Sequence, residues 1–233
     1  MKLSILIPVY NEKNTINTIL EKIMNLDLGL LEKEIIIIDD CSTDGTREIV
    51  QSLGGSYKTL YHEKNQGKGA AIRTGLKEVT GEYVVVQDAD LEYDPQDLRT
   101  MAQKMIANNL RVLYGSRRLN KDNKQHSGFQ YYLGGWFLTI ITNILYRQRL
   151  TDEPTCYKMF KADFIKSMPL VCRRFEFCPE VTALAALRGE KIQEIPIAYY
   201  PRHKSEGKKI NWQDAVTAVR VLVLYKIKSL FKK

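Results

Sequence analysis

Hydrophobic residues recur along the chain in short uninterrupted runs, and a polar or glycine-containing segment closes each run. Strands that are covered on both faces lose the usual alternation of apolar and polar positions. Such runs therefore predict buried strands, here at 3–9, 34–38, 59–62, 84–86, 112–117 and 192–199.

Between these runs, apolar residues return at the three- and four-residue spacing of amphipathic helices. The clearest case is Ile16, Ile19, Leu20 and Ile23, and similar spacing follows 46 and 69. Strands that alternate with helices predict a mostly parallel central sheet with helices on both faces. The expected fold class is therefore α/β and Rossmann-like.

The second half contains two longer apolar segments, 129–146 and 211–233. We expect one domain over 1–233, with these segments as membrane- or partner-facing helices. For 129–146, a core or dimer helix and a lipid-facing surface element are equal alternatives. Arg220, Lys226 and Lys228 interrupt the last segment too often for it to span a membrane.

Polar segments follow the predicted strands at the point where each strand ends. In open α/β sheets, ligands bind at the carboxyl ends of the strands, because the loops after successive parallel strands meet there. We therefore expect a site built from the segments 8–12, 39–44, 67–69, 88–92 and 116–117.

The most informative of these segments is Asp88-Ala89-Asp90, followed by Glu92. Taken alone, an acidic pair after a strand is more often a cap or a solvated turn. Its companion segments make a metal–diphosphate site the better hypothesis, with Mg²⁺ or Mn²⁺ held by oxygen ligands. Asp90 is the expected ligand, Asp88 binds the same ion or the ribose, and Glu92 is a third carboxylate. The metal would neutralise a leaving diphosphate.

The other segments suit the remaining parts of a nucleotide-sugar. Pro8 and Tyr10 can wall a base, Glu12 can bind a ribose hydroxyl, and Asp39 can accept hydrogen bonds from a base edge. Lys68 can approach the phosphates or the base. Helix capping is the plain alternative for Asp39.

Arg117 can donate two hydrogen bonds to phosphate oxygens, although a surface arginine after a strand is also common. A P-loop is absent from the sequence, which argues against ATP hydrolysis.

Composition narrows the class of partner. The net charge is +8, and much of the excess lies near the C-terminus, which favours a phosphate or a membrane surface over nucleic acid. The four cysteines show no CxxC spacing, so we expect neither zinc nor a disulfide framework. We find no signal-like or membrane-spanning run and expect a cytoplasmic protein, peripheral at the cytoplasmic face of the membrane if its acceptor is a lipid.

With these motifs assembled, the chain resembles the family 2 inverting glycosyltransferases of the GT-A fold, and within them the dolichyl-phosphate mannosyltransferase-like branch. The resemblance covers almost the whole chain and is carried by its ordered motifs, at 5–12, 38–46, 65–71, 87–92, 115–117, 151–158 and 201–208.

The resemblance implies transfer of a sugar from a GDP- or UDP-sugar to a polyprenyl phosphate, whose own oxygen is the nucleophile. By position, Asp39 matches the base-binding aspartate and Asp90 the metal aspartate. Arg117, Arg202 and Lys208 match residues that hold phosphates. The catalytic residues it implies are thus Asp90 and Arg117.

Two departures from the family pattern matter. Glu92 stands where the branch often has glutamine, which would alter the metal shell. The transmembrane segments that many members carry at the C-terminus have no counterpart here, so we expect membrane contact to be peripheral or through a membrane-protein partner or homodimer.

Two alternatives stay open. The acceptor could be a hydroxyl of a saccharide or protein, which would require a base, with Glu180 and Asp152 as candidates. The chain could also be a non-catalytic nucleotide-sugar-binding subunit.

Overall fold

The structure is a computed structural model that describes residues 1–123, 128–202 and 212–231. Its centre is a seven-stranded sheet in the order β3-β2-β1-β4-β6-β5-β7. The strands are β1 (Lys2–Val9), β2 (Glu32–Asp39), β3 (Lys58–Tyr61), β4 (Tyr83–Val86), β5 (Val112–Ser116), β6 (Lys158–Lys161) and β7 (Gln193–Pro196). All pairings are parallel except the two that β6 makes with β4 and β5. The predicted mostly parallel α/β sheet is confirmed.

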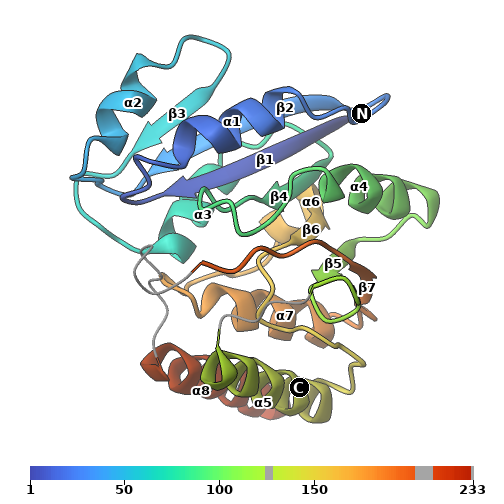
Figure 1. The fold of residues 1–233 in the computed structure, drawn as a ribbon. Coiled ribbons are helices and arrows are strands. Elements are labelled where there is room, and N and C mark those ends of the chain that lie inside the picture. The colour runs from blue at the N-terminus through green and yellow to red at the C-terminus, as the bar shows by residue number, and fades with distance from the viewer. Residues whose placement is uncertain (124–127, 203–211, 232–233) are drawn as a thin grey trace.

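The uninterrupted apolar runs are explained by helices on both faces of the sheet (Figure 1). Along β1, Leu3, Ile5 and Ile7 join the core on one face, whereas Leu6 joins the core on the other. Side chains alternate between faces along a strand, so both sets must be apolar when both faces are covered. The first face carries α1 (Ile16–Met24), α2 (Thr46–Ser52) and α4 (Asp97–Ala107), and the second carries α3 (Lys68–Leu76), α6 (Ala162–Lys166) and α7 (Phe177–Leu187).

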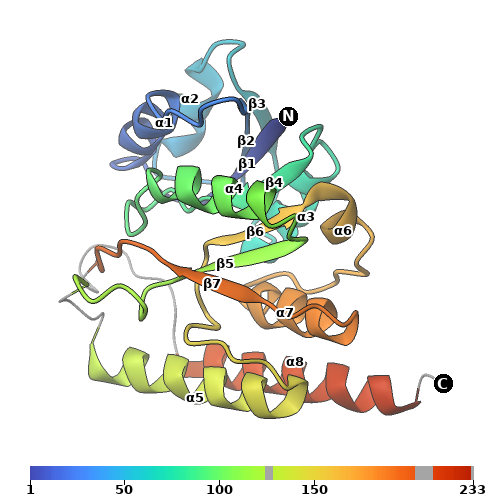
Figure 2. The same cartoon turned by 90° about the vertical axis from the view of Figure 1, so that its right-hand side faces the viewer.

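Two long helices form an outer layer, separated from the sheet by α7 (Figures 1 and 2). They are α5 (Phe129–Tyr146) and α8 (Trp212–Phe231), and they lie side by side and contact both each other and α7. Leu138, Ala183 and Leu222 lie in the small apolar core between the three helices. The Tyr146 hydroxyl donates to the Leu222 carbonyl at 2.6 Å, which ties α5 to α8.

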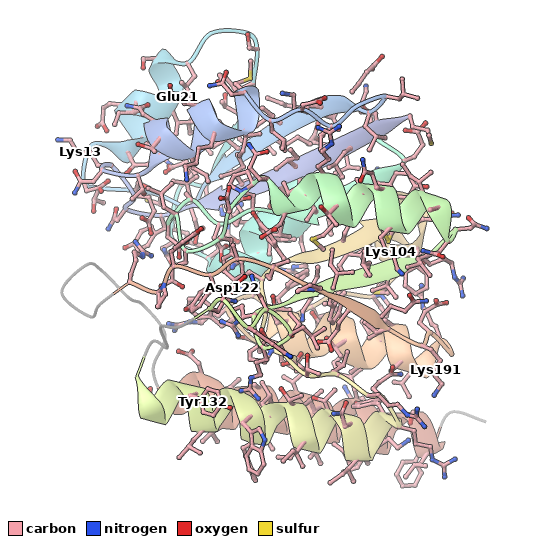
Figure 3. The ribbon with its side chains drawn as sticks, turned by 45° about the vertical axis from the view of Figure 1, so that its right-hand side comes forward. Lys13, Glu21, Lys104, Asp122, Tyr132 and Lys191 are labelled. Atoms are coloured by element: carbon pink, nitrogen blue, oxygen red, sulfur yellow. The ribbon has the colours of Figure 1, made fainter. Side chains whose placement is uncertain are left out.

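The outward side of this layer is unusually apolar. We call it the apolar face; it consists of the exposed Tyr132, Leu133, Trp136, Phe137 and Ile144 of α5 and the exposed Val216, Val223, Leu224, Ile227, Leu230 and Phe231 of α8. Elsewhere, charged side chains such as Glu21 of α1 and Lys104 of α4 cover the helices (Figure 3). Within the described ranges, neither of these helices nor any other is sufficiently long and hydrophobic to span a bilayer.

The chain after β4 differs from the expected pattern. The antiparallel strand β6 and the helices α4 and α6 were not predicted. The strand expected over 192–199 ends at Pro196. Beyond it, the Ala198 amide donates to Asp97 Oδ2 at 2.7 Å, and Tyr199 makes a single bridge to Tyr93, so the chain leaves the sheet for the α4 side.

Candidate active site

The loops that leave the carboxyl ends of β1, β2 and β4 share an unusual backbone turn. Asn11, Cys41 and Leu91 adopt left-handed conformations with φ of 52°, 65° and 63°. Such φ values are uncommon for residues other than glycine and cluster at functional sites. Because β1 lies between β2 and β4, the three turns bring their polar side chains to one edge of the sheet.

One arginine lies among three carboxylates at this edge. Arg202 Nη1 is 3.1 Å from Glu12 Oε2, its Nη2 is 3.0 Å from Asp90 Oδ2, and its Nε is 3.9 Å from Glu92 Oε1. We call these four residues the Arg202 cluster. The structure thus brings together residues from three motifs that are far apart in the sequence, at 5–12, 87–92 and 201–208.

Glu92 also fastens the segment that carries Arg202. Its carboxylate accepts hydrogen bonds from the Arg202 amide (3.0 Å) and the Tyr199 hydroxyl (3.0 Å), and its carbonyl accepts from the Tyr200 amide (2.8 Å). The segment after β7 is therefore held against the loop after β4.

The electrostatic state of Asp90 follows from these neighbours. Burial, together with the negative charges of Asp88 and Glu92, raises the pKa of Asp90 to about 7, although the Arg202 guanidinium acts in the opposite direction. The Arg202 guanidinium thus offsets only part of the effect that burial and the neighbouring carboxylates have on the pKa of Asp90.

Asp88 is held separately. It forms an ion pair with the Lys68 ammonium, which also donates to Cys156 Sγ at 3.1 Å. Burial acts to raise the pKa of Asp88, but the adjacent Lys68 charge outweighs it and the pKa is lowered. The glycines around Lys68 serve packing, because a Cβ on Gly67 would lie 2.6 Å from the Arg173 carbonyl oxygen.

The residues present fit a hard divalent cation, because carboxylate oxygens converge on one cationic group. As they stand, no three His, Cys, Asp or Glu side chains in the described part of the chain are arranged around one ion position. The Arg202 guanidinium lies among the carboxylates instead. Mg²⁺ is commonly bound by one or two carboxylates plus substrate phosphates, so a full protein cage is not required.

The predicted base-binding residue Asp39 is fully buried. Its carboxylate accepts from Arg47 Nε at 2.6 Å and from the Ser42 amide. Arg47, in the first turn of α2, also lies over the Tyr61 ring at 5.6 Å. Sequence reasoning did not identify Arg47, since nothing in its spacing links it to Asp39.

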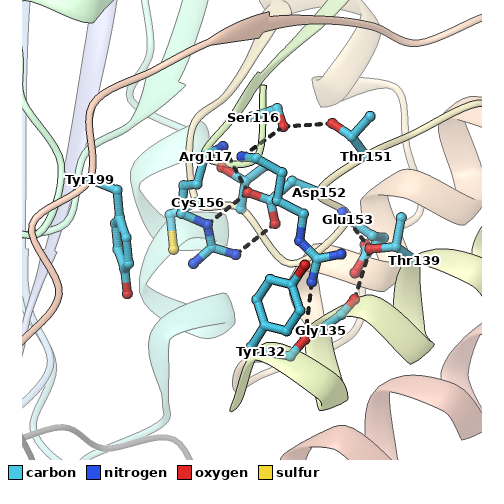
Figure 4. Close-up of polar contacts among 12 residues, drawn as sticks. Ser116, Arg117, Tyr132, Gly135, Thr139, Thr151, Asp152, Glu153, Cys156 and Tyr199 are labelled. Atoms are coloured by element: carbon cyan, nitrogen blue, oxygen red, sulfur yellow. Dashed lines mark hydrogen bonds and ion pairs between the residues drawn. The ribbon is translucent and has the colours of Figure 1, made fainter. Parts of the chain in front are cut away.

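Arg117 follows β5 and is locked in place by Asp152. Its Nε and Nη2 each donate to one oxygen of the fully buried Asp152 carboxylate at 2.7 Å (Figure 4). The Asp152 amide in turn donates to Glu194 of β7 at 3.0 Å. Asp152 therefore orients Arg117, and this role was not predicted.

The neighbouring Arg118 reaches the outer layer. Its guanidinium lies 4.8 Å from the Tyr132 ring centre and donates to the Tyr132 carbonyl at 3.1 Å. The arginine pair after β5 therefore connects the carboxyl edge of the sheet to the start of α5 and the apolar face.

The remaining predicted residues lie as follows. Pro8 is in β1 and Tyr10 directly after it, both half-buried. Lys208 lies outside the described residues. Glu180 is fully buried and accepts from the Val171 and Cys172 amides and the Tyr225 hydroxyl, so it anchors α8 to the start of α7 and does not face the site.

Several polyprenyl-phosphate sugar transferases are similar in sequence to most of this chain. A dodecaprenyl-phosphate galacturonate synthase of Rhizobium johnstonii is 24% identical over 89% of the chain and 62% of its own length. A UDP-N-acetylglucosamine–dolichyl-phosphate N-acetylglucosaminyltransferase of Methanococcus voltae is 29% identical over 83% of each. A dolichyl-phosphate beta-glucosyltransferase of Trichomonas vaginalis is 28% identical over 84% of the chain and 65% of its own length. The chain thus spans less than two thirds of the first and third of these relatives.

Solved structures share the fold. Glucosyl-3-phosphoglycerate synthase of Mycobacterium tuberculosis, in complex with Mn²⁺, UDP and phosphoglyceric acid, superposes with a TM-score of 0.72 at 15% identity, over 98% of this chain and 78% of that one. S. aureus TarS with UDP-GlcNAc gives 0.65 at 20% identity, over 97% and 66%. The expected GT-A fold is confirmed.

The sequence profile of glycosyl transferase family 2 matches residues 4–168, which is most of the chain and runs from within β1 to beyond β6. The protein therefore belongs to glycosyl transferase family 2.

Proposed function

We propose that the protein is a metal-dependent inverting glycosyltransferase that moves a sugar from a GDP- or UDP-sugar to a polyprenyl phosphate. The observation that carries the proposal is the continuity from the acidic Arg202 cluster, through the arginines after β5, to the apolar face. A donor diphosphate, an anionic acceptor and a lipid chain each have a matching surface along this line.

The nucleotide-sugar donor would bind at the carboxyl edge of the sheet. Asp90 and Glu92 would hold Mg²⁺ or Mn²⁺, with Asp88 on the ribose or the same ion, and Asp39 would face the base. When bound, the metal neutralises the charge that develops on the leaving diphosphate. Glucosyl-3-phosphoglycerate synthase, which shares the fold, has been crystallised with Mn²⁺ or Mg²⁺ and UDP, and this supports a divalent metal and a nucleoside diphosphate here.

The acceptor phosphate would bind at Arg117 and Arg118. A planar guanidinium fixed by Asp152 is suited to hold a phosphate in one orientation. One acceptor phosphate oxygen forms a bond to the anomeric carbon while the bond from that carbon to the diphosphate breaks, and the diphosphate leaves with the electron pair. The configuration inverts because attack and departure occur on opposite sides.

A phosphate acceptor is favoured over a hydroxyl acceptor by the state of the candidate bases. A hydroxyl must lose a proton, whereas a phosphate oxygen is already anionic at neutral pH. Asp152 and Glu180 are both fully buried and engaged in hydrogen bonds with Arg117 and with the segment before α7, respectively. Neither is placed to accept a proton from an acceptor.

The acceptor's location sets the location of the enzyme. The relatives above are named for dodecaprenyl and dolichyl phosphates. We propose that the apolar face rests on the cytoplasmic leaflet, with the exposed Arg220 and Lys228 of α8 near anionic headgroups.

The test is a transfer assay with labelled GDP- and UDP-sugars, Mn²⁺ and a polyprenyl phosphate. We expect label in the butanol-extractable lipid, and Asp90→Asn should lower its formation at least about 100-fold. Asp27→Asn is the control, since Asp27 is an exposed acid far from the site that pairs with Arg99. Label that stays wholly in the aqueous phase would refute the lipid acceptor.

A further inference from the structure

The position of Arg202 is informative because its guanidinium contacts the carboxylates of Asp90 and Glu92, which are the proposed metal ligands. Its guanidinium approaches the carboxylates of Glu12, Asp90 and Glu92 at 3.1, 3.0 and 3.9 Å. These side chains are all largely buried, with Arg202 itself only 17% exposed. Buried carboxylates must be compensated by a positive charge, whether it comes from an ion or from a side chain.

A guanidinium and a divalent metal compete for the same oxygens. A guanidinium donates N–H groups at about 2.7–2.9 Å, whereas Mg²⁺ requires oxygens at about 2.0–2.1 Å with octahedral geometry. Carboxylate oxygens that accept from the guanidinium therefore cannot ligate a metal ion at the same time. This agrees with the finding that no acidic group among the described residues is arranged around an ion position.

We propose that Arg202 is an internal competitor of the metal: without donor it occupies the carboxylates of Asp90 and Glu92, and it yields them when a nucleoside diphosphate brings the metal and offers its own phosphate oxygens to the guanidinium. The inference rests on the proposed function, since it assumes that a metal and a nucleotide bind at this edge. It adds that the metal binds poorly alone and that the two bind cooperatively.

The charges favour such an exchange. In the described structure, the carboxylates of Glu12, Asp90 and Glu92 all face the Arg202 guanidinium. A divalent ion supplies more positive charge than Arg202, and the diphosphate supplies a new anionic partner for the displaced guanidinium. Each ligand alone would leave either Arg202 or the phosphates without compensation.

The contrasting hypothesis is that Arg202 has a purely structural role and stays bound to these carboxylates. Its amide and Tyr199 are both bound to Glu92, so the segment could hold the loop after β4 permanently. In that case, removal of the guanidinium would loosen the loop and weaken metal binding. The two hypotheses therefore predict changes of opposite sign in the metal affinity.

The experiment is a Mn²⁺ titration followed by electron paramagnetic resonance, with and without GDP or UDP. Without nucleotide, Arg202→Gln should bind Mn²⁺ at least about tenfold more tightly than the wild type. Addition of nucleotide should increase the Mn²⁺ affinity of the wild type by about tenfold or more, and that of the variant by much less. Arg99→Gln is the control for loss of one positive charge, because Arg99 pairs with the exposed Asp27, and it should match the wild type.

Equal or weaker Mn²⁺ binding by Arg202→Gln, in a variant whose thermal unfolding is cooperative, would overturn the inference. Arg202→Lys covers the case in which the glutamine variant does not fold, and it too should bind Mn²⁺ more tightly because an ammonium cannot reach all three carboxylates at once. A chain that binds no Mn²⁺ with any nucleotide also overturns it. The readout requires no sugar transfer, so failure of the lipid-acceptor proposal leaves a positive result intact.

Discussion

At the scale of single residues, Asp90 shows how the site is balanced. Its pKa is raised from 3.8 to about 7 by burial and by its acidic neighbours. The folded protein therefore binds this proton more tightly than the unfolded chain does. The resulting stabilisation is fully present below about pH 4 and is lost as the pH rises through about 7.

We expect Asp90→Asn to remove this loss. In metal-free buffer, the free energy of unfolding of the variant relative to the wild type should increase between about pH 5 and pH 8, because only the wild type acquires a buried charge. The increase should reach at most about 4 kcal/mol, given about 1.4 kcal/mol per pKa unit. Urea denaturation at several pH values measures it, and a constant difference would contradict the raised pKa.

The sequence predicted most members of this site but not their partners. Asp90 and Glu92 follow a strand and could be assigned to the sheet edge from their position alone. The pairing of Arg202 with Glu12 joins residues 190 positions apart, and the pairing of Asp39 with Arg47 depends on the exact turn between β2 and α2. Such contacts arise from the tertiary structure, which local patterns do not encode.

At the scale of elements, the start of α3 shows a close approach of two backbones. A Cβ on Gly69 would lie 2.8 Å from the Cys172 carbonyl oxygen and 2.9 Å from that of Arg174. The Ala70 amide also donates to the Arg173 carbonyl at 2.9 Å. The segment before α7 thus lies directly on α3, and Gly69 allows this contact.

Gly69→Ala should therefore destabilise the protein by about 1–3 kcal/mol, as overpacked sites do, even though alanine is the better helix former. Gly54→Ala is the matched control, because a Cβ there meets nothing within 4 Å, and we expect little change. Urea denaturation of both variants provides the comparison. Equal stabilities would mean that the two backbones can separate without cost.

The elements that were predicted correctly are those with a strong local signal. β1 and β2 carry long aliphatic runs, and both are found where the pattern placed them. β6 has only four residues, begins with a buried lysine and pairs antiparallel between β4 and β5. Its assignment depends on neighbours that are far away in sequence, so no local pattern could have indicated it.

At the scale of the whole molecule, the layers separate two tasks. The carboxyl edge of the sheet gathers the polar site, and α5 and α8 form an outer layer that reaches the sheet through α7 (Figure 2). The Arg118–Tyr132 contact connects the two regions. We therefore expect membrane binding and nucleotide binding to be altered by different substitutions.

A double variant of the apolar face, Phe137→Ser with Ile144→Ser, should bind vesicles containing anionic lipid at least about tenfold more weakly. The reason is that serine does not gain the favourable free energy of transfer from water to lipid that each apolar side chain gains. Leu30→Ser is the control, since Leu30 is 95% exposed but lies in the turn between α1 and β2. Co-sedimentation measures both. Equal losses, or none, would argue against this face as the membrane contact, and a dimer in solution would identify a second copy as its partner.

The outer layer has a practical consequence for spectroscopy. Trp136, one of the two tryptophans of the chain, is an exposed residue of α5. In a Trp212→Phe variant, indole fluorescence therefore reports on this layer, and its emission should shift to shorter wavelength when the helices meet lipid. A second variant, whose single tryptophan follows β4, would give the nucleotide site an optical signal of its own.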